Sequence, residues 1–283
     1  MDYFDDAMQK LSHASVRNFN NPAALNWPER VDRDDWQFTP ELISLSPTPI
    51  WQQLDETTRK RLGFFEAINF FSLNIHGEKY LISEVSRRLY RDDDLYLNQY
   101  LLHFIEEESK HMMYFSQFCQ RYADKIYPDN TLTIGSEQDS AVQDFLLFAR
   151  IYLFEEIVDE YNRIIAADER VSGIAREINH LHHIEEARHL AFGRKFLYRQ
   201  LEQLNEILDT EVRNYIREHL QGYLEMTWKQ FYNPRVYQDA GIEDAFDVWQ
   251  KAYHDPAAIA HRQRICSERM GLLRELKLIE VPS

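Results

Sequence analysis

Apolar residues recur at helical spacing through most of the chain after residue 55. One stripe runs through Phe71, Ile75, Ile82 and Val85. Residues repeated at intervals of three and four lie on one face of an α-helix. No proline occurs in residues 52–126 or 130–232, and proline breaks helix interiors. The pattern predicts four long helices, at about residues 55–90, 95–122, 137–167 and 173–206.

Further helices are predicted after Asp209, at about residues 210–231, 242–254 and 256–276. The charged run 91–94, the polar segment 128–136 and the run 168–173 read as connections between the long helices. Residues 1–54 hold five of the nine prolines and three of the five tryptophans. We therefore predict an irregular N-terminal arm (1–54) packed on a single helical domain (55–283).

Two glutamates lie on apolar stripes of this kind. Glu78 falls between Ile75 and Ile82. Glu155 continues the stripe of Phe148, Ile151 and Val158. A buried carboxylate is costly unless a cation accompanies it.

Glu-x-x-His occurs three times, and the spacing places its Glu and His on one helix face. A metal site in a four-helix bundle takes this motif from two helices and one Glu from each of the other two. The three motifs are Glu108 with His111, Glu177 with His180, and Glu186 with His189.

The presence of an upstream glutamate distinguishes two of these motifs from the third. Glu78 lies 30 residues before Glu108, while Glu156 and Glu155 lie 30 and 31 residues before Glu186. The midpoints of both spans fall in predicted turns, so each upstream Glu would lie level with its motif. The motif of Glu177 has no Glu at a comparable distance and is rejected. A solvated polar face is the simpler alternative, but it does not explain the repeated register.

The third helix leaves a choice between two neighbouring residues. The 30-residue spacing favours Glu156, which shares its face with polar residues. The apolar stripe favours Glu155, and we give the stripe more weight.

The stretch HLHHIEEARH, residues 180–189, adds another imidazole. His182, Glu186 and His189 form one line down a helix. His183 is an alternative to His182, but the seven-residue spacing to His189 favours His182. Glu107, Asp159 and Glu185 are candidates for the layer outside the ligands, where a carboxylate accepts the other N–H of a ligand histidine. For Glu107 and Glu185 the alternative is a solvated acid.

The composition of the chain excludes some classes of binding partner and indicates where the protein is located. A formal net charge of −15 argues against nucleic acid and anionic membrane surfaces. The two cysteines lack motif or framework spacing, which favours buried thiols in a cytoplasmic protein. The acidic N-terminus does not read as a secretory signal, and no apolar run is long enough to span a membrane.

A Glu followed about 30 residues later by a (D/E)-E-x-x-H unit, with the whole arrangement repeated, resembles the ferritin-like di-iron carboxylate oxygenases. The additional His182 is similar to the arylamine N-oxygenases typified by p-aminobenzoate N-oxygenase. This resemblance implies an all-α, ferritin-like four-helix core with extra C-terminal helices. It also implies a seven-residue ligand set: Glu78, Glu108, His111, Glu155 (or Glu156), His182, Glu186 and His189. One departure is that Glu107 and Glu185 stand where such motifs commonly have Asp.

The resemblance further implies two iron ions per chain, O2 activation through a peroxo intermediate, an aromatic amine as substrate and a homodimer. Carboxylate and imidazole ligands serve manganese as well as iron. The electron donor and the substrate-binding residues are unknown from the sequence. The alternatives are a di-iron hydroxylase or desaturase that oxidises carbon, and a non-enzymatic iron-binding helical protein.

Overall fold

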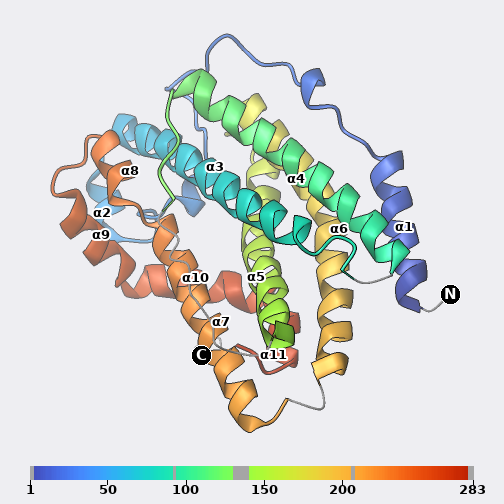
Figure 1. Cartoon of the computed structure of the whole chain (residues 1–283). Coiled ribbons are helices and arrows are strands. Elements are labelled where there is room, and N and C mark those ends of the chain that lie inside the picture. Colours follow the sequence, from blue (N-terminus) through green and yellow to red (C-terminus); the bar gives the residue numbers. More distant parts are fainter. Residues whose placement is uncertain (1–2, 92–93, 130–139, 205–207, 280–283) are drawn as a thin grey trace.

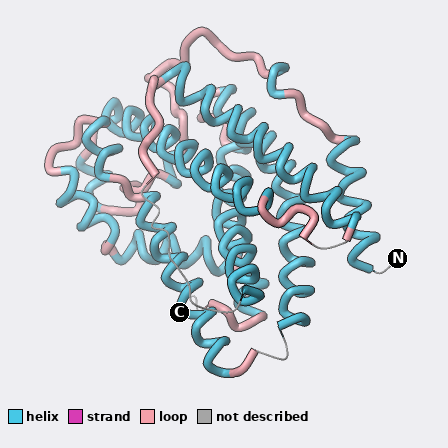
Figure 2. Tube along the Cα trace, in the orientation of Figure 1, coloured by secondary structure: helices cyan, strands magenta, loops and turns pink. Residues whose placement is uncertain are grey.

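The computed structural model describes residues 3–91, 94–129, 140–204 and 208–279. Within these ranges every regular element is a helix, apart from an isolated parallel bridge between Trp36 and Val171. Figure 2 shows these helices and the loops that join them. None of the described helices is both long enough and apolar enough to cross a lipid bilayer. The predicted all-α fold class is confirmed.

Four long helices form the centre of the molecule (Figure 1): α3 Glu56–Ser86, α4 Leu95–Tyr122, α5 Ser140–Ala167 and α6 Gly173–Leu204. Helix α3 packs along α4, and α5 packs along α6, so the chain forms two helical hairpins. Asp55 caps α3 by accepting a hydrogen bond from the Thr58 backbone N–H at 2.7 Å. Asp94 caps α4 in the same way, through Leu97.

The helix bounds agree with the prediction to within a few residues where the chain is described. Residues 92 and 93 of the first predicted turn lie outside the described residues, as do 130–136 of the predicted connector and 137–139 at the predicted start of α5. The second turn falls between Ala167 and Gly173, as predicted.

The described C-terminal part has more helices than the three that the sequence predicted. The helices of this part are α7 Thr210–Phe231, α8 Pro234–Asp239, α9 Ala245–Tyr253, α10 Pro256–Arg269 and α11 Gly271–Glu275. Helices α7 and α10 pack against α5. The predicted helix 256–276 is divided at Met270, which leaves helical geometry between α10 and α11.

The N-terminal arm also has more regular structure than predicted. It begins with helix α1 Tyr3–Arg17, which packs against α4 and α6 (Figure 1). The prolines that suggested an irregular arm all lie between residues 22 and 49, so nothing interrupts α1. Beyond α1 the arm is largely irregular, with two short 3-10 turns and helix α2 Pro49–Gln53.

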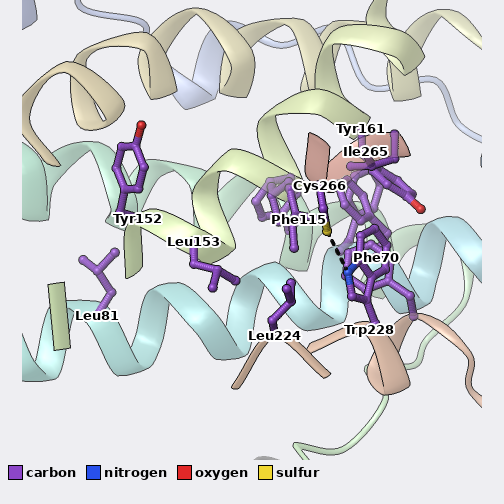
Figure 3. Close-up of a cluster of buried hydrophobic side chains, with 14 of the residues drawn as sticks. Phe70, Leu81, Phe115, Tyr152, Leu153, Tyr161, Leu224, Trp228, Ile265 and Cys266 are labelled. Carbon is purple, nitrogen blue, oxygen red and sulfur yellow. Dashed lines mark hydrogen bonds between the residues drawn. The ribbon is translucent and has the colours of Figure 1, made fainter. Parts of the chain in front are cut away.

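Aromatic side chains fill the interior (Figure 3). Phe71 stacks on Phe115 with ring centroids 5.1 Å apart, and Phe70 stacks on Tyr161 at 5.7 Å. The Trp228 indole N–H donates to Sγ of Cys266 at 3.4 Å. Cys266 and Cys119 are both buried free thiols, as predicted.

Candidate metal centre

The four long helices bring seven predicted residues together in the protein interior. None of them is more than 4% exposed. Their nitrogen and oxygen atoms form three overlapping groups, and within each group the atoms lie no more than 4.8 Å apart. The residues are Glu78 from α3, Glu108 and His111 from α4, Glu155 from α5, and His182, Glu186 and His189 from α6.

Two carboxylates lie between the imidazoles. Glu108 has one oxygen 3.1 Å from His111 Nδ1 and the other 3.0 Å from His189 Nδ1. Oε1 of Glu186 lies 3.0 Å from His189 Nδ1 and 3.1 Å from His182 Nε2. Oε1 of Glu78 completes this side at 3.5 Å from His182 Nε2.

The two neighbouring glutamates of α5 point in different directions. Glu155 belongs to a group with His182 and Glu186. Glu156 instead accepts a hydrogen bond from the Tyr152 hydroxyl at 2.5 Å and pairs with Arg269 Nε at 2.9 Å. The structure therefore brings Glu155 to the cluster and turns Glu156 toward α10.

His111 and His189 are each held by a carboxylate from the opposite motif helix. His111 uses Nε2 to contact Glu185 at 2.9 Å, and His189 uses Nε2 to contact Glu107 at 2.9 Å. When each Nε2 carries the proton it donates outward, and Nδ1 is left to face the cluster with its lone pair.

Both outer carboxylates also accept from a basic residue. Lys110 lies 2.8 Å from Glu185, and Arg188 Nη2 lies 2.5 Å from Glu107. Burial would raise their pKa values, but the His189 and Arg188 contacts lower the pKa of Glu107 to about 2. His111 and Lys110 lower the pKa of Glu185 to about 2 in the same way. These two acids are therefore ionised at neutral pH.

Asp159, the third residue predicted for this outer layer, does not contact a histidine of the cluster in the structure. It pairs with His183 at 2.5 Å and with Arg269 at 2.6 Å. Because His183 is turned to Asp159, His182 is the histidine that faces the cluster. Asp159 lies between His183 of α6 and Arg269 of α10, so this structure does not place it beside a histidine of the cluster.

The outer partner of His182 is Asn162, which the sequence analysis missed. Its side-chain amide lies 2.5 Å from His182 Nδ1. The amide nitrogen makes this contact, and the amide oxygen has no hydrogen-bond partner. If the amide is rotated so that its oxygen faces His182, that oxygen accepts the hydrogen bond from Nδ1–H. Nε2 would then carry the lone pair toward the cluster. Asn162 follows Glu155 by seven residues, and that helical spacing is the signal that could have identified it.

The unpaired atoms of the cluster test whether metal ions fit. Both oxygens of Glu78, Oε2 of Glu186 and Nε2 of His182 are buried without a hydrogen-bond partner. Such atoms are costly when buried alone. Burial, with the charges of Glu108 and Glu186, raises the pKa of Glu78 well above its usual value. Four carboxylates and three imidazoles would be satisfied by two divalent cations, with a charge balance of zero.

Residues 3–277 match the sequence profile of the family described as P-aminobenzoate N-oxygenase AurF. The chain belongs to this family. Membership makes it an oxidoreductase of the ferritin-like di-metal class.

Among other proteins, this AurF-family chain is 25% identical over 264 residues to the uncharacterized proteins Mb0909 of Mycobacterium bovis and Rv0885 of Mycobacterium tuberculosis. Each match covers 88% of this chain and 75% of the relative. Two solved mutants of an R2-like ligand-binding oxidase with a reconstituted Mn/Fe cofactor have similar folds. Their TM-scores are 0.54 and 0.50 and their identities 15% and 17%, over 97% of this chain and 94% of theirs.

A pocket of about 300 Å³ in this AurF-family chain is lined by residues of α4, α5 and α6 and by none of the cluster residues. Phe148 and Phe196 line its apolar part, and three arginines line its polar part: Arg88, Arg91 and Arg199. Phe192 links Phe148 to Phe104, with ring centroids 6.2 Å and 5.7 Å away. Phe104 in turn lies 4.2 Å from the ring of His189. Aromatic rings therefore occupy the space between this pocket and the cluster.

Proposed function

We propose that the seven clustered residues hold two divalent metal ions and that the protein uses O2 to oxidise the nitrogen of an aromatic amine. Iron is the proposed metal, with manganese as an alternative. The third imidazole, His182, is the observation that carries this proposal, because it supplements the two Glu-x-x-His motifs within a chain of the AurF family.

Glu108 and Glu186 would hold the metal ions together with the histidines, because each carboxylate reaches two imidazoles. Glu78 and Glu155 would supply the other two carboxylates. Metal binding would displace the protons that burial favours on Glu78 and Glu155 in the metal-free protein.

When bound, two reduced metal ions would supply the electrons that activate O2. The protein itself orients the histidines through Glu107, Glu185 and Asn162. Phe104 and Phe115 pack against His189 and His182, with ring centroids 4.2 Å and 5.0 Å apart. These rings exclude water from the inner face of the site and so favour reaction with substrate.

The family description supports an aminobenzoate-like substrate. The pocket beside Phe148 does not carry this proposal, because the rings of Phe192 and Phe104 lie between it and the cluster. The homodimer implied by the resemblance stays a prediction, which light scattering of the purified protein tests.

The decisive experiment measures metal content after anaerobic reconstitution and then stopped-flow absorbance on mixing with O2. We expect about two metal ions per chain and a transient visible band that decays faster with p-aminobenzoate or aniline. Mass spectrometry should find hydroxylamine or nitro products. Carbon-hydroxylated or desaturated products would assign the site to carbon oxidation, and the absence of stoichiometric metal would contradict the whole proposal.

A further inference from the structure

The two outer carboxylates of the cluster receive equivalent hydrogen bonds from different chemical groups. Oε1 of Glu107 accepts from both Nε and Nη2 of Arg188. Oε1 of Glu185 accepts from Nζ of Lys110 at 2.8 Å. A guanidinium presents several N–H groups in a fixed plane, whereas a lysine ammonium is a single flexible donor centre. Arg188 Nη2 also lies 3.8 Å from Oε1 of Glu185, which is too far for a hydrogen bond, so Lys110 is the basic residue that donates to this carboxylate.

The N-terminal arm supplies the missing donor. Nδ2 of Asn20 donates to the same Oε1 of Glu185 at 3.0 Å. Glu185 has no exposed surface and Lys110 is 5% exposed, so Asn20 enters a protected position. The other oxygen of Glu185 holds His111 at 2.9 Å.

The residue before Asn20 acts on the same lysine. Lys110 Nζ lies 4.7 Å from the centroid of the Phe19 ring, in cation–π contact. Phe19 and Asn20 follow α1, which packs on α4 and α6 (Figure 1). The docked helix thus brings two consecutive residues to Lys110 and Glu185.

We propose that Asn20 is a positioning residue of the metal centre: with Lys110 it holds Glu185, and through Glu185 it orients His111. Asn20 and Lys110 together donate the two hydrogen bonds to Glu185 that Arg188 alone donates to Glu107. Docking of the N-terminal arm and metal binding at the His111 half are consequently coupled. This inference rests on the proposed metal site.

The test is an anaerobic Co²⁺ titration of the full chain, followed by visible absorbance and calorimetry. Loss of an outer hydrogen bond to a ligand histidine typically weakens metal affinity by about 10–100-fold. We expect Asn20→Ala to lower the affinity for one of the two Co²⁺ ions by about tenfold and to leave the affinity for the other unchanged. Asn20→Asp, which faces Glu185 with a second carboxylate, should lower the affected affinity further.

Asn18→Ala is the matched control, because Asn18 is an exposed asparagine in the same segment. In one outcome, wild type binds two Co²⁺ ions while Asn20→Ala, Asn20→Asp and Asn18→Ala all bind them with the same affinities as wild type. That result would overturn the positioning role of Asn20 and leave the proposed metal site standing. No Co²⁺ binding in wild type would overturn the proposed metal site itself.

A rescue variant tests the chemical equivalence. Lys110→Arg in the Asn20→Ala background provides a guanidinium like that of Arg188 and should restore the lowered affinity. Failure to restore it in a variant whose circular dichroism matches that of wild type would contradict the equivalence of Asn20 plus Lys110 with Arg188.

Coupling must be reciprocal, because the metal changes arm docking by the same factor as docking changes metal affinity. Trypsin cleavage after the exposed Arg17 reports this docking. Co²⁺ should slow the cleavage in wild type and have less effect in Asn20→Ala. Equal rates with and without Co²⁺ in wild type would overturn the coupling.

Discussion

Helix α6 carries two Glu-x-x-His motifs that differ in what they face. Glu186 is buried in the cluster, whereas Glu177 and His180 of the other motif are exposed. We expect Glu186→Ala to abolish stoichiometric binding of at least one metal ion, because it removes an oxygen shared between His182 and His189. Elemental analysis after anaerobic reconstitution measures the loss.

Glu177→Ala is the internal control for that experiment, because it removes the same side chain from the same helix. It should retain two metal ions per chain. Full metal content in Glu186→Ala would refute the assignment of Glu186 as a ligand.

Glu66 provides a separate prediction about pH. This carboxyl is buried on α3, where Ser44 donates to it from its hydroxyl and its backbone N–H. Burial raises the pKa of Glu66 to about 8 from an ordinary value of 4.5. Between these values the folded protein holds a proton that the unfolded chain lacks. The stability from this group is therefore complete below pH 4.5, falls progressively as the pH rises above 4.5, and is fully lost once the pH has passed through 8.

Glu66→Gln removes that dependence, because an amide does not titrate. One pKa unit corresponds to about 1.4 kcal/mol. The free energy of unfolding of the variant, relative to wild type, should therefore increase by about 2.5 kcal/mol between pH 5.5 and 7.5. Urea unfolding of both metal-free proteins at the two pH values measures this change. Parallel pH profiles would show that Glu66 does not retain its proton.

At the residue scale, the sequence predicted the residues whose positions follow from helical spacing. The seven clustered residues, Glu107 and Glu185 all fall in this group. Asn20 could not be predicted, because 165 residues separate it from Glu185 and only the packing of α1 brings them together. The contact of Asp159 with Arg269 could not be predicted either, since it depends on where α10 packs.

At the element scale, the spacing of about 30 residues fixed how the long helices align. Each upstream glutamate lies level with its motif because the turn between them falls halfway. Helix α1 was missed because proline content was averaged over residues 1–54, although the prolines begin at residue 22. Helix α8 was missed because six residues are too few to show a helical period. Helix α11 was predicted as the end of α10, because the sequence did not show the break at Met270.

Helix α10 packs against α5, and Arg269 at its end pairs with acidic residues of α5. Arg269 pairs with Glu156 at 2.9 Å and with Asp159 at 2.6 Å, and both acids are buried. Arg269→Ala leaves these two carboxylates without their arginine. We expect it to lower the free energy of unfolding by about 2 kcal/mol, less than for a fully buried pair because Arg269 is partly exposed.

Arg264→Ala on the same helix is the comparison, since Arg264 pairs with Glu268 at the surface. An exposed pair contributes about 0–1 kcal/mol. The midpoints of urea unfolding measure both variants. Equal losses in the two would contradict a specific role for Arg269 in holding α10.

At the scale of the whole molecule, the chain buries four clustered carboxylates and three imidazoles that would hold two metal ions. Metal ions that bind the folded chain alone should stabilise it, by about 2.7 kcal/mol for each site at a free concentration 100 times its Kd. For a chain of this size that corresponds to a Tm increase of roughly 5–15 °C for two sites. Calorimetry with and without Mn²⁺ under anaerobic conditions measures the increase.

The same measurement separates the two neighbouring glutamates of α5. Glu155→Gln removes an acid that faces His182 and Glu186, so it should remove about half or more of the Mn²⁺-induced increase in Tm. Glu156→Gln removes an acid that faces Arg269 and Tyr152. It should lower the Tm of the metal-free protein and keep the full Mn²⁺-induced increase, because its carboxylate lies outside the cluster. The reverse result would make Glu156 the ligand, which would require α5 to rotate about its axis when metal binds.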